Sequence, residues 1–378
     1  MKRILFISTR NPYSNRYSGD VLRSKKIINL LERNFNLDIC CLGKRKTELQ
    51  KSNLTIFGQP NYFLKILYCL ISLLSLKPIH FGLFYSNEMK LFLQNNANNY
   101  DYLFFYHIRS SQYLPNNYYG KTIIEMGDLY SDNYFQTYNY LRVYNPLKYI
   151  YFLESLFVRR LEKKILDRFD KITLFSKNDL KKIHKKFKKK IFQIDESVEK
   201  ISKKFRFSKK NSKILFIGNI NYLPNFLACK DFIKNIFPKL RLEYPKIKFC
   251  IIGEINKMNK KLLSTYPNIE ILGPKNNLSD FVKNSICGLA NLKIATGVQG
   301  KVLTYMSYGL PVICSQRVAQ NFGSNVLSFN KDTELIKIIV SLINNKSISS
   351  EYSKKSLKLS KTLNWRNVSQ KYLKLLKF

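Results

Sequence analysis

The sequence is poor in residue types on which several common chemistries depend. It has 25 Asp and Glu against 65 Lys and Arg, with three His and one Trp in 378 residues. The seven Cys are an odd number and form no CxxC pair, and most of them lie in apolar runs. Such cysteines behave as small hydrophobic residues, so the pattern argues against a disulfide framework and a zinc site. We therefore expect a reducing, cytoplasmic compartment.

The scarcity of acids leaves a formal net charge of +40. Such a charge attracts nucleic acid, anionic lipid or phosphorylated molecules without distinguishing between them. A solvated basic surface, amplified by a biased base composition of the genome, explains it equally well. Two lysine runs, KKIHKKFKKK (residues 181–190) and KKFRFSKK (residues 203–210), concentrate the charge in the middle of the chain. Because no RNA-recognition signature, zinc-finger spacing or Gly-Arg repeat accompanies them, nucleic acid is not the expected partner.

Long hydrophobic runs are also lacking. The longest candidate, YFLKILYCLISLLSL (residues 62–76), contains Lys65 and falls short of the roughly 20 apolar residues that a membrane span requires. It predicts a helix that is either buried or lies at a membrane interface. The opening KRILFI (residues 2–7) is too short for a signal peptide and predicts a buried first strand.

Short apolar runs alternate with helical patterns along the whole chain, and no fixed-period repeat is present. Because parallel strands are buried on both faces, such runs are typical of parallel sheets. We predict an α/β fold with two doubly wound Rossmann-like domains that face a cleft. The expected boundaries are residues 1–207, residues 208–360 and a helix in residues 361–378 that crosses back to the first domain. The strands are expected at residues 2–7, 37–42, 100–106, 121–126 and 171–176, and then at 213–218, 248–253, 269–273, 285–292 and 310–315.

The segment TGVQGKVLTYMSYGLPVI (residues 296–313) carries the strongest functional signal. It reads as a glycine-containing loop, a helix and a strand. A helix amino terminus offers unpaired N–H groups and a partial positive charge, which suit phosphate. Gly297 and Gly300 would let the backbone approach a ligand closely, and Gly309 would end the helix in a left-handed cap before Pro311. Any helix between two strands needs such a stop, so the preceding TGVQGK is what favours binding.

These motifs give the chain a resemblance to the GT-B glycosyltransferases, specifically to the retaining family 4 (glycosyl transferases group 1) and its exopolysaccharide-type members. The loop, helix and G-x-P-V arrangement is the most specific match. Further matches extend over nearly the whole chain: RILFISTRNP (3–12), FFYHIRSSQYL (104–114), IIEMGDLYSD (123–132), FIGNINYLPN (216–225), FCIIGE (249–254) and IEILGPKNNLSDFV (269–282).

The resemblance implies a role for particular residues. In the first domain, His107 and Asp128 are implied as catalytic residues and Gly19 as part of a donor-facing loop, with Arg23 as a phosphate partner. Each has an ordinary structural alternative: a hydrogen-bonded loop histidine, a helix cap and a turn glycine. In the second domain the resemblance implies that the donor contacts Asn219, Asn221, Thr296, Gly297, Gly300, Lys301 and Thr304.

Thr296 and Thr304 depart from the family, whose members usually place two glutamates at these positions. A threonine hydroxyl forms single hydrogen bonds and cannot act as a charged bidentate acceptor for a ribose diol. Two alternatives to an active enzyme therefore stay open. One is a relative that binds nucleotide sugar without turnover, and the other is a basic protein that binds nucleic acid or membrane through its lysines.

The resemblance implies transfer of a hexosyl group from a UDP- or GDP-linked sugar to a hydroxyl of a sugar or lipid-linked sugar, with retention at the anomeric carbon. Polysaccharide or glycolipid assembly is the implied process. No D-x-D sequence is present, so no cofactor and no metal are expected, and basic residues with the helix terminus would neutralise the diphosphate. An anionic membrane surface is a further expected partner, at the inner face of the membrane.

Overall fold

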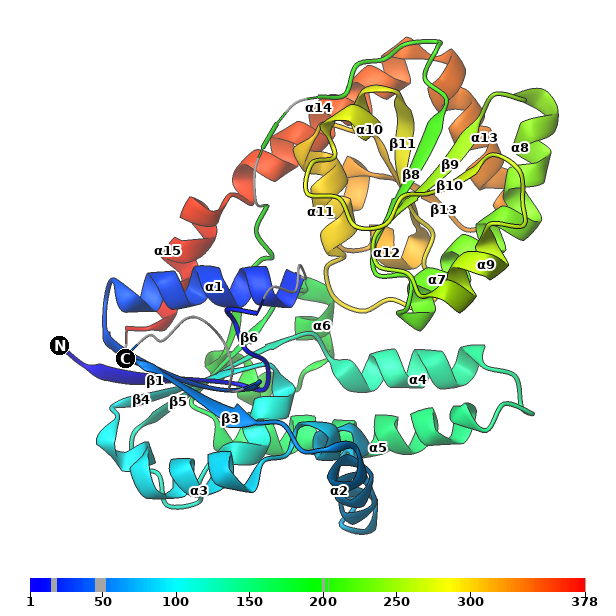
Figure 1. Cartoon of the computed structure of the whole chain (residues 1–378). Helices are drawn as coiled ribbons and strands as arrows, with labels where there is room; N and C mark the ends of the chain where they lie inside the picture. The colour runs from blue at the N-terminus through cyan, green and yellow to red at the C-terminus, as the bar shows by residue number, and fades with distance from the viewer. Residues whose placement is uncertain (15–18, 45–51, 199–200, 203, 378) are drawn as a thin grey trace. The chain divides into compact units, whose positions relative to one another are not determined.

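A computed structural model describes residues 1–14, 19–44, 52–198, 201–202 and 204–377 (Figure 1). The chain forms two compact units, residues 1–194 with 371–378, and residues 195–370. Each unit is a parallel sheet with helices on both faces, which confirms the predicted pair of doubly wound α/β domains.

Unit 1 contains a seven-stranded sheet in the order β3-β2-β1-β4-β5-β6-β7, and all of its paired strands are parallel. Its strands are β1 Arg3–Ser8, β2 Asn36–Gly43, β3 Leu54–Gly58, β4 Tyr102–Tyr106, β5 Lys121–Gly127, β6 Lys171–Leu174 and β7 Ile191–Gln193. Its helices include α1 Gly19–Glu32, α2 Tyr62–Leu74, α3 Asn87–Asn96, α4 Tyr130–Tyr140, α5 Leu147–Arg168 and α6 Lys177–Lys182, with 3-10 turns η1 Ile79–Phe84, η3 Ile108–Tyr113 and η4 Lys185–Lys190.

Unit 2 contains a six-stranded parallel sheet in the order β10-β9-β8-β11-β12-β13. Its strands are β8 Lys213–Ile217, β9 Lys248–Ile252, β10 Ile269–Ile271, β11 Ser285–Ala290, β12 Val312–Ser315 and β13 Leu327–Phe329. Its helices include α7 Leu223–Asp231, α8 Phe237–Glu243, α9 Lys257–Leu263, α10 Ser279–Lys283, α11 Gly300–Ser307, α12 Gln316–Ala319, α13 Asp332–Asn344 and α14 Lys346–Thr362, with a π-helical turn η5 Phe232–Ile236 after α7. Helix α15, Trp365–Leu375, begins in unit 2 and ends in unit 1, as predicted for the last helix.

The strand order reverses direction once in each sheet, between β1 and β4 in unit 1 and between β8 and β11 in unit 2. In open α/β sheets, ligands bind beyond the carboxyl ends of the strands at this reversal, because the two flanking loops diverge there. The segments that follow β1 and β4, and those that follow β8 and β11, are therefore where a site is expected.

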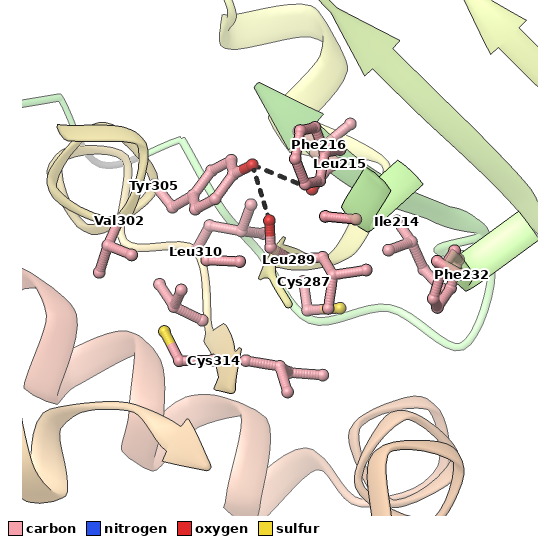
Figure 2. Packing of buried hydrophobic residues seen from close by; sticks show 14 of the residues in the cluster. Ile214, Leu215, Phe216, Phe232, Cys287, Leu289, Val302, Tyr305, Leu310 and Cys314 are labelled. Atoms are coloured by element: carbon pink, nitrogen blue, oxygen red, sulfur yellow. Dashed lines mark hydrogen bonds between the residues drawn. The ribbon is translucent and has the colours of Figure 1, made fainter. Parts of the chain in front are cut away.

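Tyr305 fixes helix α11 at the reversal in unit 2. Its side chain is fully buried, and its hydroxyl accepts from the N–H of Ile217 at 2.7 Å. The same hydroxyl lies 3.1 Å from the Leu215 oxygen and 3.2 Å from the Leu289 oxygen (Figure 2). An added Cβ at Gly288 would lie 2.3 Å from the Tyr305 ring, so this strand position has room only for glycine. The contacts hold the helix against both central strands, β8 and β11.

Helix α2 corrects one of the two alternatives for the apolar run in residues 62–76. None of its residues is buried, so the buried helix is wrong. Its outward face is a stripe of exposed apolar side chains at helical spacing: Tyr62, Phe63, Ile66, Leu67, Leu70, Ile71 and Leu74. Within the described part of the chain, no helix is both long and apolar enough to cross a membrane.

Candidate functional site

A pocket lies at the strand reversal of unit 1. Residues after β1 form one wall, the beginning of α1 forms another, and the end of β4 with the following turn η3 completes it. The lining residues are Ser8, Thr9, Arg10, Asn11, Pro12, Asp20, Val21, Ser24, Tyr106, His107 and Arg109. Of the residues predicted for a site in this unit, the pocket contains His107 and excludes Gly19 and Asp128.

His107 follows β4 directly and has a strained backbone. Its φ of 71° with ψ of 149° lies in a region that residues other than glycine rarely adopt, at a cost of order 1–3 kcal/mol. Hydrogen bonds hold it there: its N–H donates to the Glu125 oxygen at 2.9 Å, and its carbonyl accepts from the N–H and hydroxyl of Ser110 at 3.0 and 2.7 Å. Backbone strain of this kind is found mainly at active sites and ligand-binding sites, where the surrounding structure fixes the residue.

The His107 ring is held neutral. Burial, and next the guanidinium of Arg109, lower the pKa of His107 to about 3. The hydroxyl of Tyr130, from α4, lies 2.7 Å from its Nδ1 atom. When that hydroxyl donates to Nδ1, the ring proton is on Nε2, which makes Nε2 a hydrogen-bond donor. His107 can therefore donate to a neutral oxygen of a ligand near pH 7, although it carries no charge.

Two arginines flank His107 in the same pocket. Arg10 forms an ion pair with Asp20 at the start of α1. The guanidinium of Arg109 packs over the ring of Phe84, 4.3 Å from its centroid, and Arg10 lies 6.0 Å from the centroid of the same ring. The pocket thus combines two cations, one carboxylate and a neutral imidazole.

Arg23 does not belong to this pocket, which corrects its predicted role as a phosphate partner. It is buried, and its Nε donates to the Glu125 carboxylate at 2.6 Å while one terminal nitrogen donates to the Tyr372 hydroxyl at 2.7 Å. The Tyr372 hydroxyl also bonds the second Glu125 oxygen. This buried cluster lies behind the site, because the Glu125 carbonyl is the acceptor for the His107 N–H.

Gly19 and Asp128 lie outside the lining. Gly19 is the exposed first residue of α1, and an added Cβ there would contact nothing within 4 Å. Asp128 is half-buried directly after β5, the strand beside β4, so it stands at the same edge of the sheet as His107. Their predicted roles stay predictions.

In unit 2, the loop after β11 and the start of α11 lie at the strand reversal. Gly297 has a φ of 59°, in the left-handed region, and its carbonyl accepts from Asn321 at 2.6 Å. Gly300 is the exposed first residue of α11, with no atom within 4 Å of where a Cβ would be. The last residue of the helix is Ser307, and Gly309 just beyond it is left-handed as predicted, with a φ of 71°; its neighbour Leu310 donates back to the Tyr305 oxygen.

Lys301, in the first turn of α11, points toward the segment after β8. Its ammonium donates to the Asn225 side chain at 2.6 Å and lies 3.8 Å from the Phe216 ring centroid. Burial lowers the pKa of Lys301 to about 7. Asn225 in turn donates to the Asn219 carbonyl at 2.8 Å, so the structure brings Lys301 and Asn219 into one cluster. The Asn219 amide donates to Glu254 at 2.9 Å, whereas Asn221 is exposed and caps the N–H of Asn256.

The two threonines in the place of glutamates use part of their hydrogen-bonding capacity within the loop and helix. The Thr304 hydroxyl donates to the Gly300 carbonyl at 3.0 Å, one turn earlier in α11. The Thr296 carbonyl accepts from the Gln299 side chain at 2.9 Å. The Thr304 oxygen keeps acceptor capacity, but its proton is committed to its own helix.

Residues 211–345, which include the whole reversal of unit 2, match the family model described as glycosyl transferases group 1. No curated protein sequence matches the chain. The solved structures that resemble it cover the whole chain at low identity. A mutant of S. aureus TarM in complex with Fondaparinux, alpha-GlcNAc-glycerol and UDP has a TM-score of 0.65 at 10% identity, with 100% of both chains covered.

HepE of Anabaena in complex with UDP and glucose has a TM-score of 0.64 at 11% identity, over 100% of this chain and 99% of that one. A structure described as trehalose-6-phosphate from E. coli, bound with UDP-2-fluoro glucose, has a TM-score of 0.66 at 11% identity over the same shares. The chain is a glycosyltransferase with the GT-B fold. Its predicted fold and activity class are therefore confirmed.

The sequence of this glycosyltransferase did not lead us to predict Arg10 and Tyr130 as parts of the unit 1 site. Arg10 lies two residues after β1, so its position beyond the end of a central strand was the available signal. Tyr130 begins a different helix and meets His107 only through the fold, and no spacing rule would have paired them.

Proposed function

We propose that this glycosyltransferase moves a hexosyl group from a UDP- or GDP-linked sugar to an acceptor hydroxyl, without a metal. The observation that carries the donor half is the amino terminus of α11 at the strand reversal of unit 2. The side chain of Gln299 does not cap the helix, and its first residue Gly300 is exposed with no atom near its Cβ position, which leaves room for a diphosphate at the helix terminus. Gly297, which is buried and left-handed, shapes the loop before the helix. A helix terminus and the neighbouring Lys301 would supply the positive potential that a metal supplies elsewhere.

His107 supports the acceptor half of the proposal. A neutral ring with its proton on Nε2 donates a hydrogen bond without adding charge, which suits a sugar hydroxyl or a carbonyl oxygen. Asp128, at the same sheet edge, would accept the proton of the acceptor hydroxyl. Retention at the anomeric carbon is proposed from resemblance, and one structural neighbour is described as an enzyme of glycosyltransfer with retention, trehalose-6-phosphate synthase.

The test is a donor screen with a matched pair of variants. Purified protein is titrated calorimetrically with UDP- and GDP-sugars, and release of the nucleoside diphosphate is then followed. Gly300→Asp puts a carboxylate at the proposed diphosphate position and should weaken binding about tenfold or more. Ser347→Asp adds the same charge to the exposed first turn of α14 and should leave binding unchanged. Equal binding by both variants, or binding across the screen without any turnover, would contradict the proposal.

The acceptor is proposed to be a growing polysaccharide or glycolipid at the inner face of a membrane. Helix α2 supports this location. Phe63 and Leu74 are 74% and 82% exposed and bracket a continuous apolar stripe, while Lys65 and Lys77 lie nearby. An apolar face that is flanked by cations, on a chain with a net charge of +40, fits the surface of an anionic bilayer.

Vesicle flotation tests the membrane contact. The protein should float with phosphatidylglycerol vesicles, and Phe63→Glu with Leu74→Glu should abolish flotation. Leu242 in unit 2 is 87% exposed, so Leu242→Glu is the matched control and should float normally. Flotation that survives the double variant would sink the assignment to α2.

A further inference from the structure

The unit 1 pocket holds one cation, Arg109, that forms no ion pair with any residue that the structure describes. Arg10 is paired with Asp20. Arg109 also lines the pocket, yet within the described part of the chain its guanidinium makes no hydrogen bond or ion pair, and its contact is the ring of Phe84. The five N–H donors of this planar group are thus directed at no acceptor of that part of the chain.

The charges around Arg109 make this arrangement unfavourable. Burial, and next the charge of Arg10, lower the pKa of the Arg109 guanidinium. Asp20 is the one carboxylate among the lining residues, and His107 is neutral, so the lining holds two guanidinium groups and one acid, which is paired with Arg10. A half-buried charge without a partner is costly, and proteins keep such groups mainly where a ligand completes them.

The chemistry of the lining indicates which kind of ligand group would pair with Arg109. A guanidinium presents a rigid fork that matches the two oxygens of a carboxylate or phosphate. The rest of the lining carries no further charge and includes polar side chains at the end of β1 and just after it, namely Ser8, Thr9 and Asn11. These groups suit the hydroxyls of a sugar or glycerol attached to that anion.

We propose that this pocket binds an anionic group, a phosphate or a carboxylate, carried by the acceptor. The inference rests on the proposed function, because it takes unit 1 as the acceptor side and assigns the donor diphosphate to α11 in unit 2. Arg109 pairs with the anion, Arg10 adds its field, and the neutral His107 contacts the attached sugar or glycerol.

The binding experiment uses the full chain saturated with the nucleotide found in the donor screen, so that the unit 2 site is filled. Inorganic phosphate is titrated by calorimetry, followed by acetate. The wild type should bind phosphate at one site. Arg109→Gln should weaken that binding about tenfold or more, and Arg109→Lys, which keeps the charge and loses the fork, should fall in between. Arg33 is exposed on the same unit, and Arg33→Gln is the control that should bind as the wild type does.

Further arms identify the source of the anion. Soluble glycerol 1-phosphate is compared with phosphatidic acid in vesicles, using the Phe63→Glu, Leu74→Glu protein to remove binding through α2. Loss of binding on Arg109→Gln in either arm supports the proposal and names the source as a free phosphate or a lipid headgroup. The proposal is overturned if neither phosphate nor acetate binds the wild type, or if the anion that binds the wild type binds Arg109→Gln equally.

Steady-state kinetics separate this proposal from the proposed function. Arg109→Gln should raise the KM for the acceptor and leave that for the donor nearly unchanged, and Gly300→Asp should do the reverse. A rise in the donor KM alone on Arg109→Gln would show that the anion is the donor diphosphate and would overturn the proposal. If no turnover exists in any protein, the transfer reaction fails, whereas phosphate binding through Arg109 is still decided by calorimetry.

Discussion

Tyr305→Phe should destabilise unit 2 through a single oxygen atom. The hydroxyl is the acceptor for the Ile217 N–H at 2.7 Å and bonds the carbonyls of two strands. Removing it leaves a backbone donor without a partner in a fully packed core, which costs about 1–3 kcal/mol. The carbonyls lose less, because each keeps a second lone pair and a ladder partner. We therefore expect the free energy of unfolding of unit 2 to fall by about 1–3 kcal/mol, or about 5- to 150-fold in the equilibrium constant.

The assay is a guanidinium titration followed by the fluorescence of Trp365, the one tryptophan of the chain, which lies half-buried in unit 2. Tyr308→Phe changes a half-buried tyrosine of the next turn and is the control. Because the phenylalanine ring of the Tyr305→Phe variant would still pack on Gly288, nucleotide affinity should change less than stability. A loss below about 0.5 kcal/mol, no larger than in the control, would refute the view that this hydroxyl anchors α11.

Three further predictions concern titratable or buried groups. Burial raises the pKa of Glu162 from its ordinary value of 4.5 to about 7. Between these two pH values folded unit 1 holds a proton that the unfolded chain releases, so its free energy of unfolding should fall as the pH rises from about 4.5 to about 7. Glu162→Gln should remove this pH dependence in denaturant titrations at pH 5 to 8. Burial lowers the pKa of Lys301 to about 7, so at pH 8 its amine is mostly neutral and should take up nearly one proton when an anionic donor binds. Calorimetry in buffers of different ionisation enthalpy measures this uptake, and Lys301→Met should abolish it. Tyr372→Phe should cost unit 1 about 1–3 kcal/mol, seen as faster amide hydrogen exchange in β1 and β5, and unchanged exchange would contradict a stabilising role for the Arg23 and Glu125 cluster.

The sequence was sufficient to predict the central strands and the left-handed glycine, Gly309, that follows helix α11. Strands such as β1, β4 and β11 are buried on both faces, so they appear as unbroken apolar runs. The edge strands β3, β7 and β13 were missed because they are short and only partly buried, which leaves little apolar pattern to detect.

The polar interior was less predictable. Helix α5 carries several basic residues, yet it buries two acids, Glu154 and Glu162. Each of these carboxylates is satisfied by a segment far away in sequence: the N–H of His80 for the first, and the N–H and hydroxyl of Ser131 for the second. Periodicity reports which face of a helix is apolar and carries no information about such partners. For the same reason the neutral state of His107 could not be foreseen, because the burial that chiefly lowers its pKa and the contact with Tyr130 both arise only in the fold.

The place of Tyr372 has a consequence for biosynthesis. Unit 1 consists of residues 1–194 and 371–378, so a ribosome finishes all of unit 2 before it makes the tyrosine that joins Arg23 and Glu125. Domains usually fold in the order in which they are translated. Here unit 1 cannot complete its fold until unit 2 has been synthesised. Until then the ion pair between Arg23 and Glu125 lacks Tyr372 and is exposed to water. Nascent chains arrested after residue 194 should therefore be far more sensitive to protease than released protein.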